Sequence, residues 1–168
     1  AEREKGGELP DFERNWRGGI MGRELADAWA ETFEATAEVF AATDPSARVP
    51  WAGPDMSARS SISARLMETW AHGQEVYDVL GVVRQNHDRI RNIVILGVNT
   101  YGWTYAVRET QPPGPMPHLR LTAPSGEIWT YGDDSVVERI EGAADEFCQV
   151  VTQVRNIADT ALVVTGEI

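Results

Sequence analysis

Apolar residues recur every three or four positions in two early stretches of the chain, which is the spacing of one face of an α-helix. The first stretch covers about residues 21–43, where acidic residues separate the large apolar side chains Leu25, Trp29, Phe33 and Phe40. The second covers about residues 58–80, and Ser57 can cap its start while Gly81 can stop it. Both stretches are predicted to be helices with one apolar face.

Proline and glycine divide the helical half of the chain. Residues 43–54 contain three prolines and are predicted to form a loop, because proline lacks the amide hydrogen that a helix interior needs. A third helix is predicted over about residues 87–109, in which Gly97 and Gly102 permit close packing or a bend. The Pro-rich segment 111–117 ends this helix and is predicted to be a semi-rigid hinge.

The apolar period changes after the hinge. Residues 118–123 and 127–131 alternate between apolar and polar and flank the turn residues 124–126, which predicts a β-hairpin. A capping-box pattern then predicts a helix over about 135–154. The β-branched run 160–165 predicts a further strand.

These patterns predict an α+β protein in which a helical part precedes a small α/β part. The expected organisation is a linker or entry segment at 1–20, a helical domain at 21–110, the hinge at 111–117 and an α/β subdomain at 118–168. The sequence starts with Ala1 in a charged stretch that is typical of the middle of a loop. We therefore expect further residues upstream of Ala1.

Charge excludes some classes of partner. The chain has 15 basic and 26 acidic residues and a formal net charge of −11, so it repels nucleic-acid phosphates and anionic membrane surfaces. Its longest apolar run, Ile93 to Val98, is far shorter than the ~20 residues that cross a bilayer. The single cysteine, Cys148, cannot form an internal disulfide, which fits a reducing cytoplasm.

Glu68 and His72 have the spacing of a metal-ligand pair. Residues four apart lie about one helical turn from each other on the same helix face, and Glu75 follows three residues later. Carboxylate and neutral imidazole suit Zn²⁺ and related ions. The same spacing is common on solvated helices, whereas the neighbouring Ala64, Ala71, Val76 and Val79 favour an enclosed face, where polar groups need partners.

The remaining candidates carry weaker signals. His87 and His118 are interpreted as surface residues, and Cys148 as a small apolar filler. Arg155 can bind a substrate carboxylate or complement the dipole at the end of a helix, and the sequence does not decide between these roles.

Two segments carry a family resemblance: Ala47-Arg-Val-Pro-Trp-Ala-Gly-Pro-Asp-Met56 and Ala64-Arg-Leu-Met-Glu-Thr-Trp-Ala-His-Gly-Gln-Glu-Val76. They resemble an actinobacterial metal-binding family that is grouped with the mycothiol-dependent maleylpyruvate isomerases and the wider DinB-like thiol transferases. Less diagnostic matches follow in order at 120–129 and 147–153. The resemblance thus covers nearly the whole chain from about residue 20.

The resemblance implies an N-terminal four-helix bundle that holds a divalent metal, usually zinc, and a C-terminal subdomain similar to sterol carrier proteins. The ligands in that family are a histidine on an early helix and a later Glu-x-x-x-His pair. Glu68 and His72 match the pair, Glu75 matches an acidic position near it, and Arg155 matches a residue that binds the substrate anion. The early helix and its histidine have no counterpart here, so we expect them upstream of Ala1.

The implied activity is thiol chemistry. The leading hypothesis is a cytoplasmic mycothiol-dependent isomerase or S-transferase that acts on a small electrophile, with zinc as metal and mycothiol as cosubstrate. The alternative is a non-catalytic module that binds a metal or an apolar ligand. Helical members of this type form dimers, so a homodimer is also expected.

Overall fold

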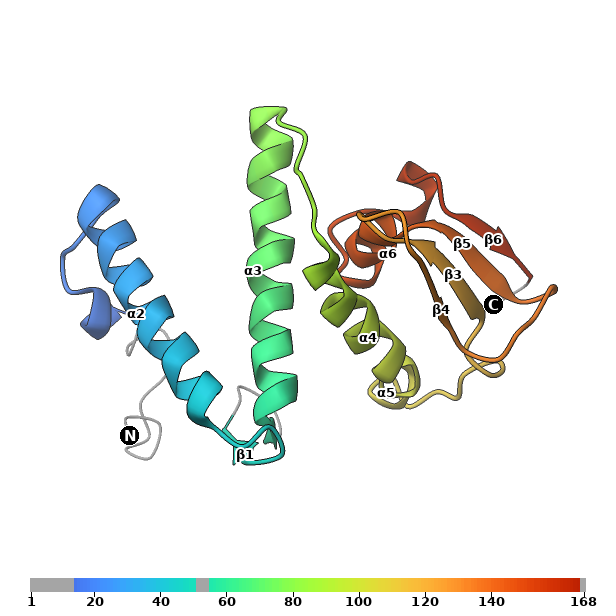
Figure 1. Ribbon diagram of the computed structural model, residues 1–168, viewed down its shortest axis with the longest axis horizontal. Coiled ribbons are helices and arrows are strands. Elements are labelled where there is room, and N and C mark those ends of the chain that lie inside the picture. The colour runs from blue at the N-terminus through green and yellow to red at the C-terminus, as the bar shows by residue number, and fades with distance from the viewer. Residues whose placement is uncertain (1–13, 51–54, 167–168) are drawn as a thin grey trace. The chain divides into compact units, whose positions relative to one another are not determined.

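Helix α2 (Gly22–Ala42) is the main element of the first of two compact units, residues 1–47 and 48–168 (Figure 1). The computed structural model describes residues 14–50 and 55–166, so residues 1–13 of the predicted entry segment lie outside the described residues. The helix has nearly the bounds that its apolar spacing predicts. No residue of α2 is buried, and Trp29 and Phe33 stack on its surface with ring centroids 5.7 Å apart.

A short antiparallel ribbon opens the second unit. Strand β1 (Arg48–Val49) lies inside the stretch 43–54 that proline predicts to be a loop, and it pairs with strand β2 (Met56–Ser57), which follows that stretch. Residues 51–54 of that loop lie outside the described residues.

Helix α3 (Ala58–Leu80) has the bounds that the sequence predicts. Ser57 Oγ accepts a hydrogen bond from the amide of Ser60 at 3.1 Å, which satisfies one of the free amides of the first turn. Gly81 ends the helix in the left-handed conformation, with φ of 64°, which glycine adopts without steric cost. Both ends of α3 are therefore determined by local sequence signals.

The helix predicted over 87–109 is divided into three pieces: η2 (Asp88–Ile90), α4 (Arg91–Asn99) and α5 (Tyr101–Ala106). Thr100 separates the last two, and its hydroxyl donates to the Leu96 carbonyl at 2.8 Å. Gly97 permits the expected close packing, because an added Cβ would lie 3.3 Å from the Val151 side chain.

A mixed sheet in the order β4-β3-β5-β6 forms the C-terminal part of the second unit (Figure 1). Its strands are β3 (His118–Thr122), β4 (Ile128–Tyr131), β5 (Arg139–Ala143) and β6 (Val163–Thr165). The antiparallel pair β3 and β4 confirms the predicted hairpin, and β6 confirms the strand predicted near the end. Strand β5 runs parallel to β3, and helix α6 (Ala144–Val151) packs against both. A short helix, η3 (Ile157–Asp159), precedes β6.

The single helix predicted over 135–154 is wrong. Ser135 Oγ accepts hydrogen bonds from the amides of Val137 and Glu138, so the capping-box residues form a turn. The next five residues form β5, which pairs with β3 on one side and β6 on the other. Pairing with distant strands therefore overrides the local helix signal, and α6 starts only at Ala144.

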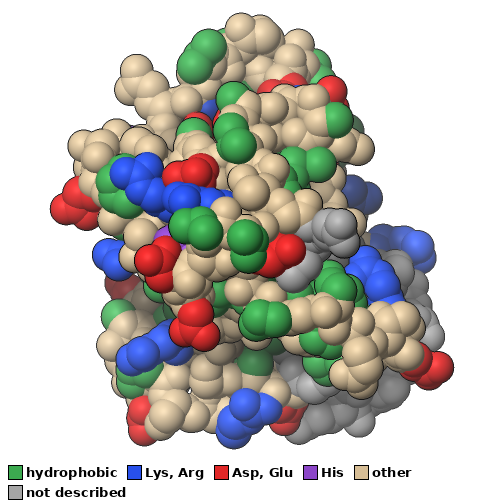
Figure 2. Space-filling model, turned by 90° about the vertical axis from the view of Figure 1, so that its right-hand side faces the viewer, with side chains coloured by type: hydrophobic (Ala, Val, Ile, Leu, Met, Phe, Trp, Pro, Cys, Tyr) green, Lys and Arg blue, Asp and Glu red, His purple; other side chains and the backbone are tan. Residues whose placement is uncertain are grey.

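The core of the second unit joins α3, α4, α6 and the sheet. Its fully buried members include Ile90, Ile93, Val94, Leu119, Leu121 and Cys148. Acidic, basic and apolar side chains are interspersed on the face drawn in Figure 2. Within residues 14–50 and 55–166, the helices are too short or too polar to cross a membrane.

Candidate functional site

The predicted metal pair lies on an exposed face of α3. Glu68 and His72 have side chains that are 52% and 72% exposed, and Glu75 is 64% exposed. Ser61 and Ala64, which precede them on the same face, are buried. The expected enclosure is therefore found for the first turns of this face but not around the three ionisable residues.

The geometry of the pair fits two positions of a zinc ligand set. His72 Nε2 lies 3.4 Å from Glu68 Oε2, and two ligand atoms bound to one tetrahedral zinc at ~2.0–2.1 Å are separated by about the same distance. His72 Nδ1 lies 3.7 Å from Glu75 Oε1, on the side where a carboxylate can orient a ligating imidazole. In the described parts of the chain, however, no cluster of three or more His, Cys, Asp or Glu side chains could hold a metal ion.

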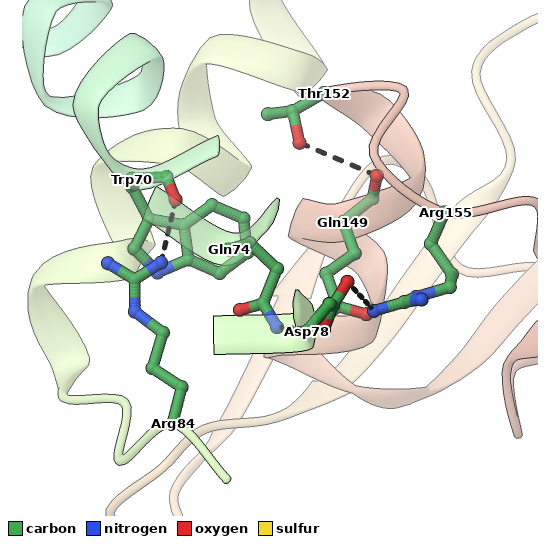
Figure 3. Close-up of polar contacts among 7 residues, drawn as sticks. All are labelled: Trp70, Gln74, Asp78, Arg84, Gln149, Thr152 and Arg155. Carbon is green, nitrogen blue, oxygen red and sulfur yellow. Dashed lines mark hydrogen bonds and ion pairs between the residues drawn. The ribbon is translucent and has the colours of Figure 1, made fainter. Parts of the chain in front are cut away.

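The opposite face of α3 borders an open cleft of about 480 Å³, which we call the α3–α6 cleft. Trp70, Gln74 and Tyr77 lie on this face, about half a helical turn away from Glu68 and His72. Polar lining residues come from α3, from the segment that follows it and from the region of α6: Gln74, Asp78, Arg84, Asn86, Gln149 and Arg155. Figure 3 shows most of these side chains directed toward one another.

A chain of hydrogen bonds holds the cleft together. The indole nitrogen of Trp70 donates to Asn86 Oδ1 at 3.0 Å, and Asn86 Nδ2 donates to Asp145 Oδ2 at 3.2 Å. Trp70 is 2% exposed, so its N–H group needs this partner. Asn86 thereby connects α3 to the first turn of α6.

Arg155 lies in the cleft and not beside Glu68 and His72. Its Nη2 atom is 2.7 Å from Asp78 Oδ2, and its Nε donates to Gln149 Oε1 at 3.4 Å (Figure 3). Asp78 also accepts a hydrogen bond from Gln74, and that bond, followed by the contact with Arg155, lowers the pKa of the Asp78 carboxyl. The structure therefore brings Arg155 to Asp78 and keeps it on the side of α3 away from Glu68.

Of the weaker candidates, two are as interpreted from the sequence. His87 is exposed, and Cys148 is a completely buried core residue whose thiol pKa is raised by desolvation. The interpretation of His118 as a surface residue is wrong, because its side chain is only 11% exposed. It starts strand β3 next to the core.

Gln74 and Arg84 were not identified by sequence reasoning. A signal for Gln74 was available, since it lies four residues after Trp70 and three before Tyr77 and is thus a polar residue on an apolar face. Arg84 follows the end of α3 and carries no such pattern. Its place in the cleft depends on how the chain returns along the helix.

Comparison with known proteins finds a family similarity in the N-terminal part of the chain. Residues 5–77 match the family model of the mycothiol maleylpyruvate isomerase N-terminal domain. This segment is similar to that domain family. The match includes Glu68, His72 and Glu75, and it confirms the resemblance that the two sequence blocks indicate.

The relatives extend the similarity without assigning an activity. Two uncharacterized proteins of Mycobacterium tuberculosis, from strains CDC 1551 / Oshkosh and ATCC 25618 / H37Rv, are each 39% identical over 144 residues. The aligned region is 86% of this chain and 56% of each relative, so the chain spans little more than half of their length. No solved structure matches the chain.

Proposed function

We propose that this chain is part of a metal-dependent enzyme that uses mycothiol in an isomerase or S-transferase reaction on a small electrophile. The observation that carries the proposal is that Glu68 and His72 fall within the segment matched by the isomerase domain family. Their 3.4 Å separation, which suits two ligands of one ion, supports it. Zinc is the proposed metal.

Each of the three residues at this site would have its own role. Glu68 Oε2 and His72 Nε2 would hold the ion, and Glu75 would accept a hydrogen bond from the Nδ1–H group of His72, which leaves the Nε2 lone pair free to bind. A bound divalent cation lowers the pKa of a coordinated thiol and so supplies a thiolate nucleophile near neutral pH. We propose that the remaining ligand comes from outside the described residues, on the early helix that the family resemblance implies.

Several finer features belong to the same proposal. The helices up to residue 110 would form part of a DinB-like bundle, residues 111–117 a hinge, and residues 118–168 a subdomain similar to sterol carrier proteins. The hypothesis that Arg155 binds the substrate anion does not enter this proposal, because Arg155 pairs with Asp78 on the side of α3 away from Glu68. The protein would act in the cytoplasm as a homodimer.

Metal analysis of the full-length protein tests the proposal. Wild type is expected to bind about one equivalent of zinc per chain, and the His72→Ala variant is expected to lose it. His87→Ala is the matched control, since His87 is an exposed histidine without a carboxylate partner in the described structure. Glu75→Gln is expected to weaken binding by about 10–100-fold without abolishing it.

Thiol consumption tests the reaction. Wild type loaded with zinc is expected to accelerate the disappearance of mycothiol in the presence of an electrophile, or the isomerisation of maleylpyruvate in the presence of mycothiol. Loss of this activity in His72→Ala and its retention in His87→Ala would support the assignment. Only traces of metal in wild type, unchanged after zinc is added, would overturn it.

The second candidate is a non-catalytic metal-binding module. It is favoured by the exposure of Glu68 and His72. Retention of zinc with no thiol consumption across a panel of electrophiles would select this function. The apolar-ligand form of this alternative would require an apolar ligand that copurifies with the protein.

A further inference from the structure

The α3–α6 cleft contains a guanidinium that has no carboxylate partner among the described residues. Arg84 Nη1 donates to the Trp70 carbonyl at 2.6 Å, and the guanidinium carbon lies 5.0 Å from the Trp70 ring centroid and 5.1 Å from that of Tyr77 (Figure 3). Its partners are thus a carbonyl and two aromatic faces. Arginine has five N–H donors, and one of them has a hydrogen-bond partner among the described residues, so donors remain for a ligand.

The guanidinium lies next to the helix at a glycine. A Cβ atom added to Gly73 would be 3.6 Å from Nη1 and 3.7 Å from Nη2 of Arg84. The helix backbone and the two rings are therefore the neighbours of the charged group. Partial burial lowers the pKa of Arg84, although arginine stays protonated at neutral pH.

Gln74, which also lines the cleft, has a side-chain oxygen without a hydrogen-bond partner among the described residues. The residue is 6% exposed and its Nε2 donates to Asp78 Oδ1 at 3.0 Å, whereas its Oε1 is buried without a donor among the described residues. The opposite amide orientation would place this oxygen against the Asp78 carboxylate, which disfavours it. A buried acceptor of this kind is stabilised by a ligand that donates a hydrogen bond.

The acidic side chains of the cleft are already committed to other partners. Asp78 contacts Arg155 and Gln74, and Asp145 accepts hydrogen bonds from Asn86 and from the amide of Glu146. Arg84 is therefore the cationic group of the cleft that a bound anion can contact without displacing an ion pair.

We propose that the α3–α6 cleft binds a small carboxylate that carries a hydroxyl or amino donor a few atoms away. The carboxylate contacts Arg84, the donor bonds to Gln74 Oε1, and Tyr77 and Val82 border the carbon skeleton. This site goes beyond the proposed thiol chemistry, because it lies on the face of α3 opposite Glu68 and His72.

Calorimetric titration of the full-length protein with two matched probes tests the site. Butyrate and 3-hydroxybutyrate differ by one hydroxyl, and wild type is expected to prefer 3-hydroxybutyrate by about tenfold because only that probe satisfies Gln74 Oε1. Arg84→Gln is expected to weaken both probes by about tenfold or more. Arg59→Gln, which removes an exposed arginine of the same helix, is the control and is expected to change neither.

Gln74→Met separates the two contacts. It keeps the length of the side chain and removes the acceptor, so it is expected to abolish the preference for the hydroxylated probe and to retain affinity for butyrate. 3-Aminobutyrate, measured alongside, distinguishes an amino donor from a hydroxyl. Thermal denaturation of each variant shows whether it is folded. If Arg84→Gln does not fold, Arg84→Lys is measured in its place, because it retains the charge and removes the planar guanidinium.

Three results would overturn the proposal. They are the absence of saturable binding of all three probes to wild type, equal affinity of wild type for butyrate and for both donor-bearing probes, and equal effects of Arg84→Gln and Arg59→Gln. Binding of the probes to Glu68→Gln is expected to equal that of wild type. A loss there would place the probes at the metal pair and would also overturn the assignment to the cleft, whatever the zinc content of the protein.

Discussion

The two faces of the later part of α3 hold their polar side chains in different ways. On one face, Glu68 and Glu75 approach His72 from neighbouring turns, and all three side chains are more than half exposed. On the other, Trp70 and Gln74 are 2% and 6% exposed and take part in contacts that reach the segment after the helix and α6. One face is organised by helix spacing and the other by tertiary structure.

Side chains that are close because of helix spacing can be identified from the sequence, whereas contacts with distant residues hold a site in place. Contacts between neighbouring turns form wherever the spacing occurs and contribute little stability when exposed. A group held by residues distant in sequence is fixed before any ligand arrives, which lowers the entropic cost of binding. The Glu68 face is therefore held by contacts between neighbouring turns of α3, whereas the cleft face is held by contacts with residues distant in sequence.

The largest effect on the free energy of unfolding is expected at Trp70, the residue of the cleft face that is part of the core. Trp70→Ala removes a ring that is 2% exposed, and we expect a loss of about 3–5 kcal/mol in the free energy of unfolding, measured by urea denaturation. The matched control is Trp103→Ala. It is the same type of substitution, but Trp103 lies on α5 and is 58% exposed. A loss below about 1 kcal/mol is expected there. Equal losses for the two variants would contradict the comparison.

A smaller loss is expected from breaking the bridge between α3 and α6. Asn86→Ala leaves the buried N–H group of Trp70 without its acceptor and Asp145 without its Asn86 donor. We expect a loss of about 1 kcal/mol, at the low end for an unsatisfied buried group, because the open cleft admits water. Urea denaturation measures it, and Asn92→Ala, at an exposed asparagine on α4, is the control. If the hydrogen bonds of Asn86 did not stabilise the fold, Asn86→Ala and Asn92→Ala would have the same free energy of unfolding.

The bounds of α3 and the proximity of Glu68 to His72 could be predicted from the sequence because both depend on neighbouring residues. Ser57 and Gly81 act on the turns next to them, and four-residue spacing places Glu68 beside His72 in any helix. The hairpin of β3 and β4 was predictable for the same reason, since the turn at 124–126 directly joins its strands.

The features that sequence reasoning missed depend on distant partners. The segment that starts at Ser135 carries a helix signal, but its later residues pair with β3 and β6 and form β5. Arg84 has no periodic pattern, and its role follows from its return to Gly73 and Trp70 along α3. Arg155 could be named as a candidate, but its Asp78 partner is 77 residues away in sequence.

The Asp78 carboxylate gives a test of the cleft face that depends on pH. Its pKa is lowered in the folded protein, chiefly by the hydrogen bond from Gln74, so its charged form stabilises the fold above the unfolded pKa of about 3.9. This contribution is lost as pH falls through the lower folded value. We expect the stability difference between wild type and Asp78→Asn to be largest near neutral pH and to vanish in acid. Urea denaturation across this range measures it, and a difference independent of pH would contradict the role of the charge.

The smallest effect on stability is expected at the other face of the same helix. Without metal, His72→Ala should change the free energy of unfolding by less than about 0.5 kcal/mol, because the side chain is 72% exposed and its partners are solvated. With zinc at about 100 times its Kd, wild type should gain about 2.7 kcal/mol, and the variant should gain none. Urea denaturation in chelator and then in zinc measures both, and His87→Ala should behave as wild type. A large loss for His72→Ala in chelator would mean that this face is packed like the cleft face, and the contrast between them would no longer hold.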